Sequence, residues 1–124
     1  MTVRTTHSRL YEHNYALGRC GEERVARIYE ERGYTILARN ISSRFGELDI
    51  IAEREGTTVF IEVKTRTTPR WGGAEAVTKQ KLRSMRRCAN AWLAGRNYTA
   101  VRFDVVEIVG ASLIIFEGVD DGAQ

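Results

Sequence analysis

The 124-residue sequence has only two cysteines and one proline, and it lacks any long apolar run. Cys20 and Cys88 lie far apart without CxxC spacing, so we expect buried thiols rather than a zinc site or a disulfide framework. No apolar run approaches the roughly 20 residues that span a bilayer. Residues 1–19 also lack the apolar stretch of about 7–15 residues found in signal peptides. We therefore expect a cytoplasmic protein that does not associate with membranes.

The composition is that of an ordinary globular protein, with 43% hydrophobic and 28% charged residues. These fractions exclude wholesale disorder and low-complexity architecture. A chain of this length forms one domain and buries roughly two-thirds of the surface that its unfolded form exposes.

The net charge of +3 is unevenly distributed along the chain. Residues 64–102 contain ten lysines and arginines and a single acidic residue, Glu75. Residues 47–62 show the opposite balance, with five acidic residues against Arg54 alone. A basic segment beside a compact acidic cluster suits a polyanionic ligand held near a cation site, although a solvated basic helix face would give the same pattern.

The hydrophobic pattern predicts one mixed β-sheet flanked by helices, which is an α/β or α+β arrangement. Residues 1–12 are expected to form a loose arm, residues 13–117 one domain and residues 118–124 a frayed tail. We predict loops over residues 40–45 and 67–73. The predicted elements are helices over 14–32 and 78–94 and strands over 34–39, 47–53, 58–66, 101–109 and 112–117.

A short turn at residues 54–57 predicts a β-hairpin whose paired residue numbers sum to 111. Asp49 then lies opposite Glu62, and Glu47 lies opposite Lys64, with all four side chains on one face. Two carboxylates about 5 Å apart repel each other by about 3 kcal/mol at an effective dielectric constant of about 20.

A divalent cation would remove this repulsion, and carboxylate oxygens are ligands that suit Mg²⁺ or Mn²⁺. Lys64 is then placed to hold a phosphate or to help deprotonate a metal-bound water. The alternative is a surface ladder in which Glu47 pairs with Lys64 and Asp49 pairs with Arg54 or with solvent.

Each predicted helix places one charged residue on its apolar stripe. Glu22 shares a face with buried-type residues of the first helix, whereas Glu23 points toward Arg27. Lys81 is the basic residue of the second helix that faces the sheet. For both Glu22 and Lys81, the alternative is a side chain that snorkels at the edge of the stripe. The remaining basic residues of that helix point outward: Lys79, Arg83, Arg86 and Arg87.

Residues 46–52 (GELDIIA) and 59–66 (VFIEVKTR) resemble the metal-binding core of the PD-(D/E)XK nucleases, with Leu48 in place of the motif's proline. The chain is more closely similar to the YraN-like bacterial family of predicted endonucleases, distant relatives of archaeal Holliday junction resolvases. This similarity extends from residue 21 to residue 106. It includes GE at 21–22, GY at 33–34, ARN at 38–40, GGA at 72–74, AV at 76–77, Lys81, WL at 92–93 and RFDVV at 102–106.

The resemblance implies a restriction-endonuclease-like three-layer core and a metal-dependent endonuclease that hydrolyses phosphodiester bonds, with structured or branched DNA as the expected substrate. It implies Asp49 and Glu62 as ligands of Mg²⁺ or Mn²⁺, Glu22 as an additional metal carboxylate and Lys64 as the catalytic lysine. Lys81 falls where several relatives place a Gln or Lys beside the active site.

The basic helix face, together with Arg66 and Arg70, is expected to bind flanking phosphates without reading sequence. Cleavage of both strands needs two sites, so a homodimer is an open possibility. Two other functions fit the sequence. One is a non-catalytic nucleic-acid-binding module that keeps the fold. The other is a protein-interaction domain that uses Trp71 and its glycine-rich loop.

Overall fold

The computed structural model describes residues 2–5, 7–10, 19–66, 79–97 and 100–119. Their order agrees with the predicted helix, strand, hairpin, helix, hairpin, preceded by two short strands. The elements are β1 (Thr2–Thr5), β2 (His7–Leu10), α1 (Arg19–Glu31), β3 (Thr35–Ser43), β4 (Gly46–Arg54), β5 (Thr57–Arg66), α2 (Lys79–Leu93), β6 (Ala100–Val109) and β7 (Ser112–Phe116).

The strands form one mixed seven-stranded sheet in the order β2-β1-β7-β6-β5-β4-β3. The strands β3, β4 and β5 pair antiparallel in succession, as do β6 and β7. The strands β5 and β6 run parallel, and α2 lies between them in the chain, as a parallel connection requires.

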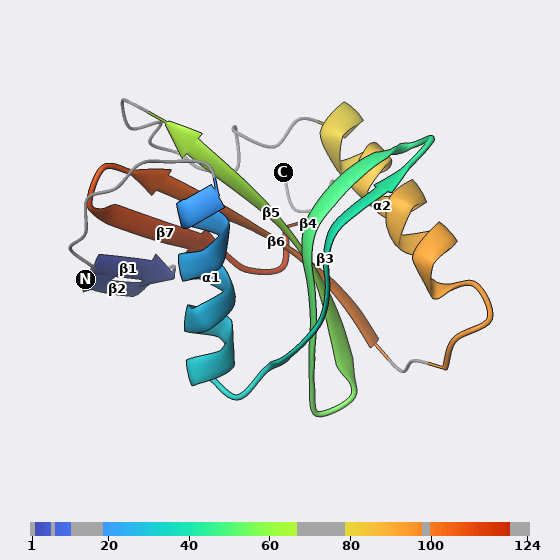
Figure 1. The fold of residues 1–124 in the computed structure, drawn as a ribbon, viewed down its shortest axis with the longest axis horizontal. Coiled ribbons are helices and arrows are strands. Elements are labelled where there is room, and N and C mark those ends of the chain that lie inside the picture. Colours follow the sequence, from blue (N-terminus) through green and yellow to red (C-terminus); the bar gives the residue numbers. More distant parts are fainter. Residues whose placement is uncertain (1, 6, 11–18, 67–78, 98–99, 120–124) are drawn as a thin grey trace.

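The two helices cover opposite faces of the sheet, which gives three layers (Figure 1). One buried cluster includes Val25 and Tyr29 of α1, and the other includes Met85 and Cys88 of α2. The predicted α/β fold class is confirmed, and the arrangement is consistent with a three-layer nuclease-like core. No helix within the described part of the chain is long and apolar enough to cross a membrane.

The N-terminal segment differs from the expected loose arm, because residues 2–5 and 7–10 form strands. The first of them pairs in parallel with β7, so that Thr2 lies beside Ser112. An edge strand such as β7 would otherwise present unpaired N–H and C=O groups, which explains why a polar segment adds to it. Residues 11–18, where we predicted the start of the first helix, lie outside the described residues.

Strand β3 is longer than predicted, because residues 40–43, expected to be a loop, continue the ladder with β4. Asn40 has a φ of 51° within this strand, a conformation that Asn tolerates better than most residues. Ile41 then pairs with Leu48 and packs against the α2-side cluster. Tertiary pairing and burial therefore outweigh the local turn signal.

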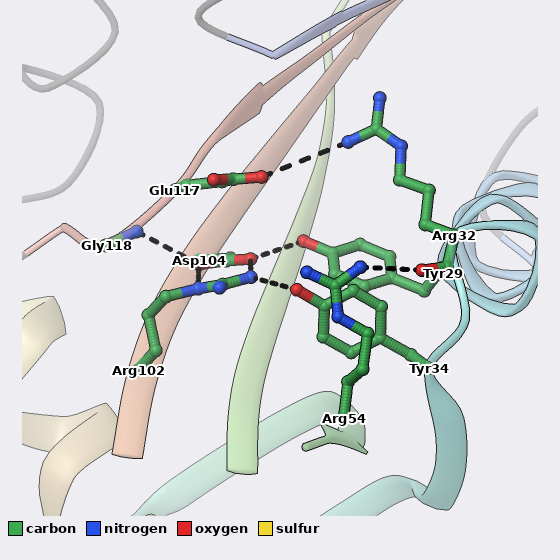
Figure 2. A network of polar contacts seen from close by, with 8 residues as sticks. All are labelled: Tyr29, Arg32, Tyr34, Arg54, Arg102, Asp104, Glu117 and Gly118. Carbon is green, nitrogen blue, oxygen red and sulfur yellow. Dashed lines mark hydrogen bonds and ion pairs between the residues drawn. The ribbon is translucent and has the colours of Figure 1, made fainter. Parts of the chain in front are cut away.

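The buried carboxylate of Asp104 in β6 binds Tyr29, near the C-terminal end of α1 (Figure 2). Tyr29 donates a hydrogen bond of 2.6 Å from its hydroxyl to Asp104 Oδ2, and Arg102 donates to both Asp104 oxygens at 2.9 Å. The backbone N–H of Gly118 also donates to Asp104, at 3.0 Å. The expected frayed tail is thus anchored at its first residue, and residues 120–124 lie outside the described part of the chain.

Candidate active site

The β4–β5 hairpin has the predicted register, because its paired residue numbers sum to 111 from Arg54↔Thr57 to Ile50↔Ile61. The ladder stops at Asp49, whose carboxylate Oδ2 accepts a hydrogen bond of 2.8 Å from the backbone N–H of Val63. A side chain therefore takes the place of the next backbone pair, and β4 separates from β5 at this residue.

The two predicted pairs Asp49–Glu62 and Glu47–Lys64 both lie beyond the end of the β4–β5 ladder, which stops at Ile50↔Ile61. Strand β4 stays paired with β3 beyond Asp49, so that Glu47 pairs with Ser42. Asn40, the residue with positive φ, falls opposite Asp49 in this register. Of the predicted square of four charges, Lys64 lies 3.8 Å from Glu62, and the charge of Asp49 acts on Glu62.

Glu62 lies on the face of the sheet that α2 covers, with only 8% of its surface exposed. Lys81 of α2 places its Nζ 3.1 Å from Glu62 Oε2, which confirms that this lysine points toward the sheet. Lys64 Nζ lies 3.8 Å from the same oxygen. Two ammonium groups, from β5 and α2, therefore approach one carboxylate.

Both sheet carboxylates have a raised pKa. Burial is the largest cause of the raised pKa of Asp49, and the neighbouring charge of Glu47 adds to it. Burial and the charge of Asp49 likewise raise the pKa of Glu62. Lys81 and Lys64 lower both pKa values without cancelling these effects. Two partly buried carboxylates that repel each other form a site where a cation would be stabilised.

Glu22 approaches the same place from the first turn of α1. Burial, the charge of Asp49 and a side-chain hydrogen bond with Asp49 raise the pKa of Glu22, while Arg39 lowers it. A Cβ on the preceding residue, Gly21, would lie 2.9 Å from Ile108 Cδ1, so glycine permits the close approach of this helix end to the sheet. Groups from α1 and α2 therefore meet at Asp49, where β4 and β5 separate.

The donor set suits a hard divalent cation, because Asp49 and Glu62 offer carboxylate oxygens. Within the described ranges, no group of three or more His, Cys, Asp or Glu side chains is arranged to hold a metal ion. Mg²⁺ commonly takes one or two protein carboxylates and retains several waters. Asp49 and Glu62 are the carboxylates that could serve as such ligands, and Glu22 lies beside Asp49.

The predicted phosphate-binding residues differ in their exposure to solvent. Lys79, Arg83 and Arg87 are exposed on α2, as expected. Arg86 is half-buried, with its guanidinium carbon 6.0 Å from the centroid of the Phe103 ring. Arg66, by contrast, pairs with a carboxylate of β6. Arg70 lies outside the described residues, as does Trp71 of the suggested protein-contact loop.

That carboxylate belongs to Glu107, which sequence reasoning did not select. Its side chain is 1% exposed and accepts a hydrogen bond from Arg66 Nε. A signal was present, because Glu107 is the single charged residue in the apolar stretch 105–109. Arg39 was also missed, and here the sequence offered no signal because its contact with Glu23, at 2.8 Å, joins separate elements.

Residues 21–108 match the family described as "Uncharacterised protein family UPF0102". A UPF0102 protein of Corynebacterium efficiens is 54% identical over 115 residues, covering 87% of this chain and 94% of the relative. One from Corynebacterium diphtheriae is 44% identical over 117 residues, covering 90% and 96%. One from a Mycobacterium species is 49% identical over 98 residues, covering 75% and 73%. These similarities confirm the YraN-like family assignment and name no activity for the family.

Proposed function

We propose that this chain, which belongs to the UPF0102 family, is a divalent-cation-dependent endonuclease that hydrolyses phosphodiester bonds, with structured or branched DNA as its substrate. The observation that carries the proposal is the meeting of Asp49 and Glu62, both with raised pKa, beside the Lys64 ammonium. Structural stability alone does not favour two repelling carboxylates at one end of a hairpin, whereas cation-assisted hydrolysis requires them. The resemblance to the PD-(D/E)XK nucleases supports the same reading.

Asp49 and Glu62 would hold Mg²⁺ or Mn²⁺, and Glu22 would support them from α1. The ion, when bound, would act as a Lewis acid and lower the pKa of water. The Val63 N–H fixes the Asp49 carboxylate, and Lys81 fixes Glu62 at 3.1 Å. Lys64, half-buried next to Glu62, is the cation placed to stabilise negative charge that develops on a phosphate.

Substrate binding is assigned to the outer face of α2. Lys79, Arg83 and Arg87 are exposed on this helix, which packs over the β4 end of the site. Cationic side chains of this kind bind phosphates without reading bases, so affinity would fall steeply with salt. A protein that cuts both strands would need a second site, which a homodimer would supply.

A non-catalytic nucleic-acid-binding module is the second candidate. The basic face of α2 favours it, because phosphate binding by Arg83 and Arg87 needs neither cation nor Lys64. Such a module would bind DNA equally well with and without EDTA and would leave the strand intact. The nuclease is preferred because binding alone gives no reason to bring Asp49 and Glu62 together.

The test is a panel of labelled four-way junction, duplex, single-stranded DNA and RNA, incubated with Mg²⁺, Mn²⁺ or EDTA. We expect cation-dependent cleavage of at least one DNA substrate by the wild type. Lys64→Ala should lower the cleavage rate by about 100-fold or more, since it removes charge stabilisation in the transition state. Cleavage that Lys64→Ala leaves unchanged, or that persists in EDTA, would reject the proposal.

A further inference from the structure

Glu107 is a buried carboxylate with only one of its two oxygens engaged. Oε2 accepts a hydrogen bond from Arg66 Nε, whereas Oε1 is buried and has no hydrogen-bond partner among the described residues. Leaving a buried charged oxygen unpaired is costly, and such atoms in a folded protein call for an explanation. The engaged oxygen fixes the carboxylate, so the other oxygen is held ready for a donor.

The register of β5 and β6 makes Lys64 a candidate donor for this oxygen. The parallel ladder pairs Lys64 of β5 directly with Glu107 of β6, so both side chains project from the same face of the sheet. Adjacent strands lie about 4.8 Å apart, a separation that a lysine side chain spans easily. Arg66 projects from this face too, two residues further along β5.

Lys64 is held loosely by its present partner. Its Nζ lies 3.8 Å from Glu62 Oε2, beyond hydrogen-bond distance, while Lys81 Nζ lies 3.1 Å from that same oxygen. The Lys64 side chain is also 37% exposed. A cation that engages Glu62 would repel the nearby ammonium, which then needs another anionic partner to remain at the site.

We propose that Glu107 is a positioning residue that accepts the Lys64 ammonium through Oε1 when a divalent cation occupies Asp49 and Glu62. The proposal rests on the proposed function and extends it to the third strand of the site. Arg66 has a supporting role, because it holds Oε2 and directs Oε1. Lys64 therefore moves from Glu62 to Glu107 when the cation binds, and it stays on the catalytic face rather than turning to solvent.

The test measures Mn²⁺ affinity by isothermal titration calorimetry in a double-mutant cycle of Glu107→Gln and Lys64→Met. Glutamine keeps the shape of Glu107 and an acceptor for Arg66 but removes the charge. The variant should bind Mn²⁺ about tenfold more weakly, because Lys64 then stays on Glu62 and competes with the ion. In the Lys64→Met background the same change should alter the affinity less than about twofold.

Two further variants separate this role from folding and from distant charge. Glu53→Gln makes the same chemical change at the far end of the hairpin, where Glu53 accepts the Gly56 N–H at 3.0 Å, and should leave Mn²⁺ affinity unchanged. Glu107→Asp keeps the charge but shortens the reach, and should also weaken Mn²⁺ binding. If Glu107→Gln fails to fold, the Mn²⁺ affinity of Glu107→Asp is measured in its place.

The outcomes distinguish this inference from the function on which it rests. Unchanged Mn²⁺ affinity in Glu107→Gln, or an equal loss with and without Lys64, would overturn the positioning role while leaving the nuclease assignment intact. A wild-type protein that binds no Mn²⁺ and cuts no substrate would overturn both. A loss of affinity that disappears in the Lys64→Met background supports the role.

Discussion

The carboxylate of Asp49 accepts a hydrogen bond of 2.8 Å from the backbone N–H of Val63 at the residue where β4 and β5 stop pairing. The bond satisfies a backbone donor that the ladder no longer reaches, and it fixes the orientation of a carboxylate that the sheet would otherwise leave free to rotate. β4 stays paired with β3 on both sides of Asp49, and the Asp49 carboxylate interacts with Glu22 of α1 and Lys81 of α2.

The raised pKa of Asp49 predicts that its ionised form destabilises the folded protein. Burial places the folded-state pKa above the unfolded value, so the cost is absent below the unfolded pKa and grows as pH rises through the folded pKa. Asp49→Asn keeps an acceptor for Val63 and removes the charge. We expect it to be more stable than the wild type by about 1 kcal/mol at pH 7, by urea unfolding.

This gain should shrink as the pH of the unfolding experiment is lowered toward 4, because the wild-type carboxyl then takes up a proton. Glu23→Gln is the matched control on α1. A hydrogen bond and the charge of Arg39 lower the pKa of Glu23, so neutralising it should give no gain at any pH. An Asp49→Asn protein less stable than the wild type at pH 7 would contradict this account of the site.

The contacts of Lys81 are expected to set the pH at which the acid limb of the pH–rate profile lies. Its hydrogen bond and charge lower the pKa of Glu62, and its charge also lowers the pKa of Asp49. In Lys81→Met the carboxylates should therefore hold their protons to higher pH. The acid limb of the plot of cleavage rate against pH should then shift to higher pH. Lys79→Met, on the exposed start of the same helix, should leave the limb in place. Coincident profiles for the two variants would contradict the role of Lys81.

The exposed arginines of α2 predict a change in the salt dependence of binding. If Arg83 and Arg87 each contact one phosphate of duplex DNA, the double replacement Arg83→Gln/Arg87→Gln lowers the slope of log affinity against log salt by about two. The turnover rate at saturating substrate should not change, since neither side chain belongs to the carboxylate site. Fluorescence anisotropy across a salt series measures the slope, and an unaltered slope would exclude α2 as the binding face.

Replacement of Asp104 should lower the stability of the fold strongly and leave the Asp49–Glu62 site unaffected. Asp104 is fully buried and accepts hydrogen bonds from Tyr29, Arg102 and Gly118 (Figure 2). Burial and then the charge of Asp104 raise the pKa of Tyr29, and the hydrogen bond with Asp104 raises the pKa of Arg102. Asp104→Asn should lower the free energy of unfolding by about 2–4 kcal/mol in urea titrations. A loss below about 0.5 kcal/mol would show that the network contributes little.

The parts of the molecule that were predictable depend on local sequence. The turn at residues 54–57 sets the register of β4 and β5, and helical spacing directs Glu22 and Lys81 inward. The predicted position of Glu47 opposite Lys64 failed because β4 leaves β5 beyond Ile50 while it stays paired with β3, which no local pattern records.

Longer-range pairing explains the other differences. The two N-terminal strands depend on the edge that β7 offers, and residues 40–43 join the sheet through β4. Glu107 was overlooked because its position beside Lys64 depends on the parallel alignment of β5 and β6, which α2 separates in the chain. Without that alignment, the sequence cannot place it beside Lys64.

If Asp49 and Glu62 hold the cation that drives hydrolysis, the loss of one of these carboxylates should slow the cleavage step itself. The most direct measurement is the single-turnover rate at which wild type and Asp49→Asn cut a labelled DNA junction in Mg²⁺, under conditions where both bind it fully. We expect Asp49→Asn to be slower by about 100-fold or more, because a metal ligand is lost while binding and fold remain. Equal rates for the two proteins would contradict the assignment.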